Sequence, residues 1–393
     1  MGIVEFVQRE WSHDAGGFYS ALDADSDGVE GKYYVWTAKE LRVVLTEAEF
    51  QIMAEVYALD GKSAWGEYES DAPANVLMKW SPDAELARPL GLDESELNRQ
   101  LKEIHAKLRR LRFERVAPGL DDKILTAWTA MMASGLTATG SVFGRPQDIN
   151  RARKALDFIL HTQRGNDGRL QNVYHESTGP RINGMLDDYG STIAACLDFY
   201  QATFETQYAL AAAELAEQAV ADFYDASLGT FWFQRTGGEA LFARKQENDD
   251  SVTPSANAQM ARNLYQLSYL FNRSDWRVMS DRMLAGALDR VDYWPSATHW
   301  AGLLLWRTEP FLEVVITSPS TEKNLEALRT LQTTYQPQRL WAGGTDESLP
   351  LLEKRLFDDL TFFICEEGSC KSPIHTLESV SYTHLTLPTI LRV

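Results

Sequence analysis

The sequence is poor in cysteine. Only three cysteines, Cys196, Cys365 and Cys370, occur among 393 residues, and none belongs to a C-x-x-C pair. Three cysteines cannot make a disulfide framework, so the chain is not expected to be a disulfide-rich secreted scaffold. Cys365 and Cys370 can form one bridge or remain buried thiols, and two thiols do not complete a zinc site. So few cysteines indicate that the protein works in a reducing compartment or that its fold does not depend on redox conditions. The cytoplasm is the expected location.

Long apolar runs and basic clusters are also missing. No apolar run approaches the about 18 residues needed to span a bilayer, and the first ten residues lack the layout of a signal peptide. Lys and Arg number 38 against 56 Asp and Glu, which gives a formal net charge of −18. Such a charge repels nucleic-acid phosphates and anionic lipids. We therefore expect no nucleic acid and no membrane among the partners, and a globular chain whose 44% apolar residues supply a core.

Acidic pairs recur ahead of apolar residues at helical spacing. The pairs are Asp121-Asp122, Asp187-Asp188 and Asp249-Asp250, which are spaced by 66 and 62 residues. A second helical pattern follows the first in the repeated units, which predicts helical hairpins. Glycine-bearing segments with alternating aromatic residues lie between the hairpins and predict short β-ribbons. A single hairpin cannot bury its apolar face, so the hairpins must pack on one another.

The length of the repeat favours a closed ring over an open solenoid, whose repeats usually have about 20 to 50 residues. We expect a mainly α fold, an (α/α) toroid of helical hairpins with the β-ribbons on one rim around a pocket. The first segment, Ile3–Trp11, is predicted to be an outer helix without its inner partner. The toroid is accordingly expected to be truncated at its N-terminus.

Three ranges divide the chain in this prediction. Residues 1–309 form the incomplete toroid and residues 310–378 form a small α/β appendage, with strands at 311–316 and 340–342 and a helix at 322–335. Residues 379–393 contain no acidic residue and are expected to be a non-native tail. Within the first range, Thr37 and Glu40 make a capping box that opens a helix towards Tyr57.

Several motifs together resemble the spermatogenesis-associated protein 20 family, which is similar to bacterial thioredoxin domain-containing proteins. The motifs are Gly16 to Gly28 with Glu30 to Thr37, Leu120 to Trp128, Leu186 to Tyr189, Asp250 to Asn257, and Cys365 to Cys370 with Pro373. The resemblance implies a thioredoxin-like domain followed by an α/α toroid similar to six-hairpin glycosidases and N-acylglucosamine 2-epimerases. Only the second part is expected here, with the thioredoxin-like domain as a partner in cis in the full-length protein.

The acidic pairs supply the first catalytic candidates. An Asp at a helix N-terminus accepts backbone N–H bonds, and this capping role alone explains its presence there. Adjacent residues on a helix do not face the same way, so each pair leaves one carboxylate free. Carboxylates from different hairpins that converge on one pocket are what glycoside hydrolysis requires. Asp122, Asp188 and Asp250 are the candidates, and the choice within each pair stays open.

Histidines suit a different reaction. An epimerase needs a group that removes and returns a proton near neutral pH, and histidine has the appropriate pKa. His175 and His299 are the two that face the same predicted rim. A structural role is the alternative for each, and neither belongs to a metal-binding motif.

Further residues of the motifs and ribbons are expected to contact substrate, although aromatic residues at helical spacing also serve as core. They are Phe18, Tyr19, Asp121, Lys123, Trp128, Asp187, Tyr189, Trp232, Arg244, Ser255 and Asn257. The segment Asp23–Gly28 copies half of a calcium loop, but Tyr34 stands where the bidentate Glu belongs, so a solvated turn is expected. No metal and no cofactor are predicted.

Two functions of different classes remain open. The first is a carbohydrate-active toroid, glycosidase-like or epimerase-like, with a small-molecule ligand such as a sugar. The second is a non-catalytic binding or scaffold module that serves the thioredoxin-like domain. The distances among the five candidate acids and histidines discriminate between them, because carboxylates that cooperate in glycosidases lie within about 10 Å of each other.

Overall fold

The computed structural model describes residues 2–57, 59, 74–237 and 244–383. The chain forms two compact units, one of residues Met1–Ser20 with Asp122–Val393 and one of Ala21–Asp121. The chain leaves the larger unit along β1 and re-enters it along β6. The domain boundaries expected at 309/310 and 378/379 stay predictions, and residues 384–393 of the expected tail lie outside the described residues.

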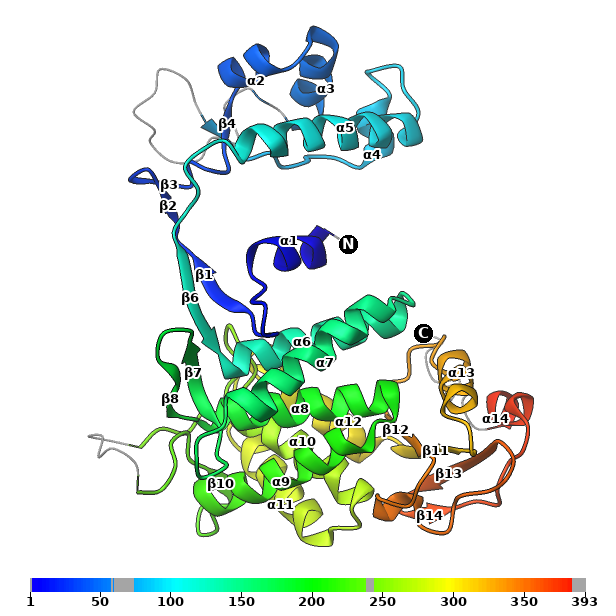
Figure 1. The fold of residues 1–393 in the computed structure, drawn as a ribbon. Helices are drawn as coiled ribbons and strands as arrows, with labels where there is room; N and C mark the ends of the chain where they lie inside the picture. Colours follow the sequence, from blue (N-terminus) through cyan, green and yellow to red (C-terminus); the bar gives the residue numbers. More distant parts are fainter. Residues whose placement is uncertain (1, 58, 60–73, 238–243, 384–393) are drawn as a thin grey trace. The chain divides into compact units, whose positions relative to one another are not determined.

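The larger unit is built mainly from helix pairs joined by short loops (Figure 1). Its helices are α1 (Gly2–Glu10), α6 (Thr126–Val142), α7 (Pro146–Thr162), α8 (Leu186–Thr203), α9 (Thr206–Phe223), α10 (Ala256–Leu270), α11 (Ser274–Leu288), α12 (Thr298–Thr308), α13 (Thr321–Leu331) and α14 (Leu377–Thr383), with 3₁₀ turns at Trp294–Ser296 and Pro350–Leu352. Within pairs, α6 packs on α7, α8 on α9 and α10 on α11. Between pairs, α6 packs on α8, α8 on α10 and α10 on α12. The first helix of each pair therefore forms an inner layer, which confirms the expected mainly α fold of the α/α-toroid class.

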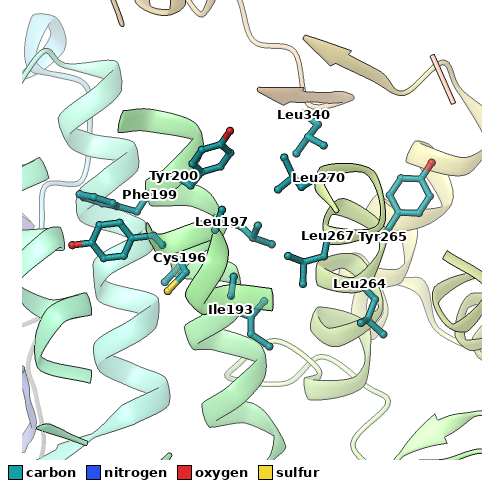
Figure 2. Packing of buried hydrophobic residues seen from close by; sticks show 14 of the residues in the cluster. Ile193, Cys196, Leu197, Phe199, Tyr200, Leu264, Tyr265, Leu267, Leu270 and Leu340 are labelled. Atoms are coloured by element: carbon teal, nitrogen blue, oxygen red, sulfur yellow. The ribbon is translucent and has the colours of Figure 1, made fainter. Parts of the chain in front are cut away.

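Burial follows from the position of each helix in these layers. In α8 most of the residues are buried, because neighbouring helices cover it on several sides. In α7, apolar side chains such as Ala152, Leu156 and Ile159 recur every three to four residues, so one face is buried and the other is polar. Figure 2 shows the core between α8 and α10, where Leu197 and Leu267 are among the fully buried side chains.

Hydrogen bonds between neighbouring inner helices show that their N-termini lie at one end of the unit. Asp188 in the first turn of α8 accepts a hydrogen bond from the N–H of Ala127 in the first turn of α6, at 3.0 Å. Ser191 of α8 donates to Gln259 of α10 at 3.1 Å. The N–H of His299, in the first turn of α12, donates at 2.9 Å to Asp250, which precedes α10. We call this end the rim.

Short strands accompany the helices as expected. Strands β1 (Tyr19–Leu22), β6 (Leu120–Leu125), β7 (Gln171–His175) and β8 (Gly179–Asn183) follow one another in a four-stranded sheet, and β9 (Tyr224–Asp225) pairs with β10 (Thr230–Phe231). The expectation that each acidic pair opens the next helix is wrong for two of the three pairs. Asp249 and Asp250 lie in the loop before α10, and the residue that caps α10 is Ser255. Asp121 and Asp122 are not at a helix start either. They lie in strand β6, four or more residues before α6 begins, and the carboxylate that caps α6 comes from Asp188 instead.

A second sheet follows the helices. Its strands are β11 (Leu312–Thr317), β12 (Arg339–Gly344), β13 (Thr361–Glu366) and β14 (Ser369–Cys370), in the order β12-β11-β13-β14. Strand β11 is parallel to β12 and antiparallel to β13. The strand, helix and strand expected after residue 310 are confirmed by β11, α13 and β12, whereas β13 and β14 were not predicted.

Residues Ala21–Asp121 make a small helical unit with its own core. Its elements are β2 (Asp25–Ser26), β3 (Val29–Glu30), β4 (Trp36–Thr37), α2 (Ala38–Val44), α3 (Glu47–Tyr57), β5 (Ala74–Asn75), α4 (Asp83–Ala87) and α5 (Glu94–Arg112). The capping box of Thr37 and Glu40 is confirmed. The helix expected to run on to Tyr57 is instead two helices, since Thr46 and Glu49 form a second reciprocal cap at the start of α3.

Candidate functional site

A histidine and an aspartate face each other where β6 leads into α6. His175, the last residue of β7, has its Nε2 3.1 Å from Oδ1 of Asp122 on β6. The Nδ1 of the same ring lies 2.8 Å from the hydroxyl of Ser177. The side chains of His175 and Asp122 keep 26% and 58% of their exposure, so solvent or a ligand reaches both. The carboxylate orients the imidazole and fixes which nitrogen carries a proton.

A second histidine and aspartate face each other at the start of α12. The Nδ1 of His299 lies 3.0 Å from Oδ1 of Asp250, and the two side chains are 35% and 9% exposed. Burial raises the pKa of Asp250, but hydrogen bonds from the N–H of Ser255, the N–H of His299 and the hydroxyl of Thr298 outweigh it, so the pKa lies below its usual range. Asp250 is therefore a carboxylate at neutral pH, held in place beside the imidazole.

The acidic pair at the start of α8 divides into a structural and an accessible member. Asp188 is fully buried. Its oxygens accept hydrogen bonds from the N–H of Ala127 at 3.0 Å, the N–H of Met185 at 2.9 Å and the side-chain amide of Asn172 at 3.0 Å. Burial and the adjacent Asp187 raise the pKa of Asp188, whereas these three N–H donors favour its carboxylate form.

Asp187 is the member that takes up a proton. Burial and the negative charge of Glu247 raise its pKa to about 6, and its side chain is only partly buried. The hydrogen bonds that the Asp188 side chain accepts all come from N–H donors. A proton on Asp188 would compete with these donors, so a proton shared by the pair is better placed on Asp187. Asp188 is the candidate expected from the sequence, with the choice within the pair open, and the geometry favours Asp187 as the carboxyl group that can exchange protons.

The raised pKa of Asp187 gives a stability prediction. The folded state holds this proton more tightly than the unfolded chain, so the stabilisation is complete below the unfolded pKa and is lost as pH rises through about 6. We expect Asp187→Asn to be more stable than the wild type at pH 7.5 and to lose that advantage at pH 4. Urea unfolding at both pH values measures this, with Asp167→Asn, an exposed acid, as control. An equal effect at the two pH values would contradict the prediction.

The loop before α10, which carries Glu247 and Asp250, is held in place by two buried side chains. The backbone carbonyl of Glu247 accepts hydrogen bonds from the hydroxyl of Ser255 at 3.0 Å and the amide of Asn257 at 3.2 Å. Asn257 also accepts from the N–H of Phe231 at 2.9 Å. Ser255 and Asn257 are fully buried, so they hold the loop and are not free to bind a ligand.

The aromatic candidates fall into buried and accessible groups. Phe18 and Tyr189 are buried, and the hydroxyl of Tyr189 accepts a hydrogen bond from Leu170, so both belong to the core. Trp128 is 46% exposed in the first turn of α6. Trp232 is covered by the guanidinium of Arg244, whose carbon lies 4.5 Å from the ring centroid. Tyr19 is half-buried, and burial and three nearby carboxylates raise its pKa.

The remaining candidates are placed differently. Lys123 is exposed on β6 next to Asp122, and Asp121 belongs to the unit Ala21–Asp121. The structure adds Asn172 and Glu247, which the sequence analysis missed. Neither lies in an acidic pair, and only pairing of β7 with neighbouring strands brings Asn172 to Asp188.

The residues that the structure describes contain neither a metal-ligand cluster nor a helix able to span a membrane. No group of three or more His, Cys, Asp or Glu side chains is arranged to hold a metal ion there. The half calcium loop contains a left-handed Asp27, whose carboxylate is 2.6 Å from the ammonium of Lys32. No described helix is both long and apolar enough to cross a bilayer.

Comparison with solved structures gives distant likenesses. An α-mannanase of Bacteroides thetaiotaomicron aligns with a TM-score of 0.40 and 14% identity over 60% of this chain and 67% of that chain. A sugar epimerase from a ruminal bacterium aligns with a TM-score of 0.36 and 11% identity over 74% of this chain and 69% of that chain. Likenesses at this level do not extend to activity.

Comparison of sequences gives much stronger similarity. No protein-family model matches the chain. Human spermatogenesis-associated protein 20 is 30% identical over 416 aligned residues, which cover 95% of this chain and 52% of that protein. The mouse protein is 29% identical with the same coverage. The chain thus spans about half the length of these curated relatives. The resemblance expected from the motifs is confirmed, and the chain is a relative of spermatogenesis-associated protein 20 over nearly its whole length.

Proposed function

We propose that this chain catalyses proton transfer on a reducing sugar, as an epimerase or isomerase. The observation that carries the proposal is the presence of two histidine and aspartate pairs, His175 with Asp122 and His299 with Asp250, at the N-terminal end of the inner helices. Epimerisation next to a carbonyl needs one group that removes a proton and another that returns one, and two imidazoles supply both.

Glycoside hydrolysis is supported less well by the same residues. It requires two carboxyl groups that are free to act as acid and as base or nucleophile on either side of the bond that breaks. Asp188 is fully buried and its oxygens are used by three N–H donors. Asp250 accepts hydrogen bonds from Ser255 and His299 and is 9% exposed. Both carboxylates are committed to holding the rim together. Asp122 and Asp187 are the two that remain accessible, and Asp122 already faces the imidazole of His175 at 3.1 Å.

In the proposed reaction the open-chain form of the sugar presents a C–H bond next to its carbonyl group. A neutral imidazole takes the proton and leaves an enediolate, and the protonated imidazole of the other pair returns a proton to the opposite face or to the neighbouring carbon. The aspartate behind each ring stabilises the imidazolium that forms. Asp187, with its pKa raised to about 6, can relay the proton of a sugar hydroxyl.

Incorporation of deuterium from solvent into the sugar tests the proposal. The full chain is incubated in D₂O with a panel of aldoses, ketoses and reducing disaccharides, and deuterium at C1 and C2 is followed by NMR. Exchange of one C–H together with a new epimer or isomer supports the proposal. Release of a free monosaccharide from a disaccharide without exchange would indicate a glycosidase instead. No turnover and no sugar binding at millimolar concentration would favour the non-catalytic scaffold.

A further inference from the structure

A disulfide with two charged neighbours lies at the other side of the unit, in the sheet that follows the helices. Cys365 on β13 is bonded to Cys370 on β14, and the two residues face each other across the antiparallel pair. Cys365 is fully buried, whereas Cys370 is only partly buried. A reagent in solution therefore has better access to Cys370 than to Cys365.

A buried glutamate stands beside the inaccessible sulfur. Glu313 on β11 is directly opposite Cys365 on β13, so the two side chains lie on the same face of the sheet. Glu313 is fully buried. One carboxylate oxygen accepts the N–H of Gly368 at 3.2 Å, and the other has no hydrogen-bond partner among the described residues. Nothing in the helical rim uses this group.

An arginine stands beside the accessible sulfur. The Nη2 of Arg355 donates to Sγ of Cys370 at 3.2 Å, and the guanidinium carbon is 6.0 Å from the ring centroid of Phe363 on the same face of β13. A guanidinium next to a sulfur stabilises the thiolate form and attracts an incoming anion. The two cysteines are thus unequal, since one has a cation and access to solvent and the other has a buried carboxyl group.

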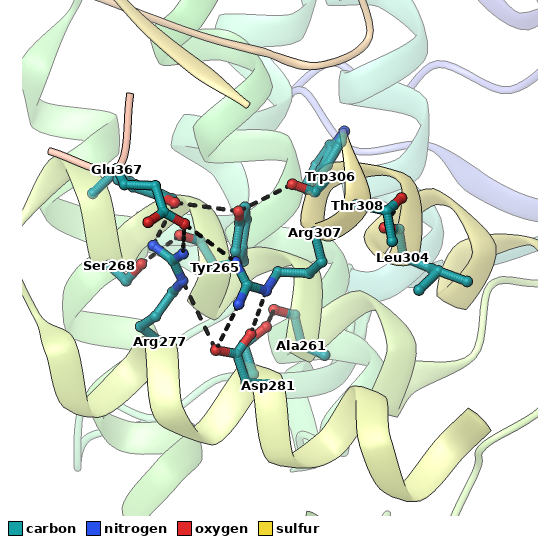
Figure 3. A network of polar contacts seen from close by, with 12 residues as sticks. Ala261, Tyr265, Ser268, Arg277, Asp281, Leu304, Trp306, Arg307, Thr308 and Glu367 are labelled. Carbon is teal, nitrogen blue, oxygen red and sulfur yellow. Dashed lines mark hydrogen bonds and ion pairs between the residues drawn. The ribbon is translucent and has the colours of Figure 1, made fainter. Parts of the chain in front are cut away.

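The turn that carries Cys370 is anchored to the helices. Figure 3 shows Glu367, which lies between the two cysteines in the chain, held by the guanidinium of Arg277 at 2.9 Å and that of Arg307 at 3.7 Å. The turn also borders a cavity of about 230 Å³ lined by Tyr265, Trp306 and Phe311 among others. Reduction of the disulfide would remove the covalent link between β13 and β14 next to this cavity.

We propose that Cys365 and Cys370 form a thiol-exchange site whose reaction partner is a dithiol. Cys370 supplies the sulfur that exchanges with the partner, and Glu313 gives a proton to Cys365 and takes it back. A thiolate of the dithiol attacks Sγ of Cys370, the disulfide bond breaks, and Sγ of Cys365 leaves with the electron pair and takes the proton of Glu313. The second thiol of the dithiol then attacks the mixed disulfide and releases Cys370 as a thiolate beside Arg355. The dithiol loses two electrons and becomes a disulfide, and its last proton restores Glu313 through solvent.

The protonation state of Glu313 agrees with this role. Burial raises its pKa to about 7, against the opposing effects of Gly368, Arg277 and Arg355. Glu366 on β13 adds a small rise, and Tyr269 on α10 is the other titratable group whose pKa is linked to Glu313. Glu313 therefore holds a proton to donate up to about pH 7 and loses it above that pH.

The first test asks which sulfur exchanges. The full chain carrying Cys365→Ser and the matched chain carrying Cys370→Ser are incubated with glutathione disulfide, and intact mass is followed with time. We expect the Cys365→Ser chain, which retains Cys370, to form the mixed disulfide at least about tenfold faster, because its thiol is accessible and beside a cation. Equal rates or the reverse order would overturn the proposal. So would a wild-type chain that still shows three alkylatable thiols after the same oxidation and unfolding.

The second test asks whether Glu313 supplies the proton. The rate at which dithiothreitol reduces the Cys365–Cys370 disulfide is measured from pH 6 to pH 9. Each rate is divided by the concentration of dithiothreitol thiolate at that pH. We expect this corrected rate to fall above about pH 7 in the wild type and to be pH-independent and about 10²-fold lower in Glu313→Gln, as for loss of a positioned general acid. Glu366→Gln, an exposed neighbour, is the matched control and should keep the wild-type rate and the fall, with the fall moved slightly to lower pH. A wild-type profile without the fall overturns the proposal, even if Glu313→Gln does not fold.

Discussion

Replacing His299 by Asn is expected to lower the rate at which the epimer or isomer forms by about 10² to 10⁴, which is the contribution of a positioned general acid or base. The carboxamide keeps a polar group beside Asp250, whose Oδ1 is 3.0 Å from the His299 ring, but it cannot carry a proton to or from carbon. His175→Asn should give a loss of the same order at the other pair. The measurement is the rate of product formation at saturating sugar, followed by NMR.

The two replacements also differ in which half of the reaction they block. One histidine removes the proton and the other returns it, so one variant should still exchange deuterium into the starting sugar without forming the epimer. Asp249→Asn is a suitable control, since Asp249 is exposed next to Asp250, and the aspartates that face the two rings are Asp122 and Asp250. If both histidine variants keep more than half of the wild-type rate, proton transfer by these pairs is excluded.

Asp188→Ala is expected to cost the larger unit at least about 2 kcal/mol of unfolding free energy, because each buried N–H donor left without an acceptor costs about 1–3 kcal/mol. The donors that lose their acceptor are on α6, at the start of α8 and on β7. Urea unfolding followed by circular dichroism measures the loss. Hydrogen exchange at the amide of Ala127 locates it, since that N–H bonds directly to the missing carboxylate.

Two further variants separate this effect from a general loss of charge. Asp122→Ala removes an exposed acid of the first pair and is expected to change stability by less than about 0.5 kcal/mol. Asp188→Asn keeps the size of the side chain but turns an N–H₂ group towards N–H donors, so it should be nearly as damaging as Asp188→Ala. An Asp188→Asn chain as stable as the wild type would show that the three hydrogen bonds do not hold the rim.

The helical layers could be predicted from the sequence because their cause is local. Periodic apolar residues such as Leu156 and Ile159 mark one buried face, and this pattern is visible without knowledge of the neighbours. The capping box of Thr37 and Glu40 is equally local. The break at Thr46 was missed because its reciprocal cap with Glu49 lies inside an otherwise continuous helical pattern.

The candidate site could be predicted only in part, because its contacts join segments far apart in the chain. The sequence makes Asp188 a catalytic candidate and Asp187 a substrate contact, with the choice within the pair open. In the structure, Asn172 and Ala127 donate hydrogen bonds to Asp188, so the proton of the pair is better placed on Asp187. The pairing of His175 with Asp122 depends on the register of β6 and β7, in which Ile124 lies opposite Tyr174. No spacing rule in one sequence reveals such a register.

The crossed caps have a consequence for how the chain gains its structure. The start of α6 is completed by Asp188, some sixty residues later, and the start of α12 by Asp250, nearly fifty residues earlier. Synthesis must therefore reach the start of α8 before the cap of α6 is complete, and a protease cut between these two hairpins would leave α6 without its cap. The hairpins are therefore not expected to fold independently of one another. We expect them to fold and unfold cooperatively.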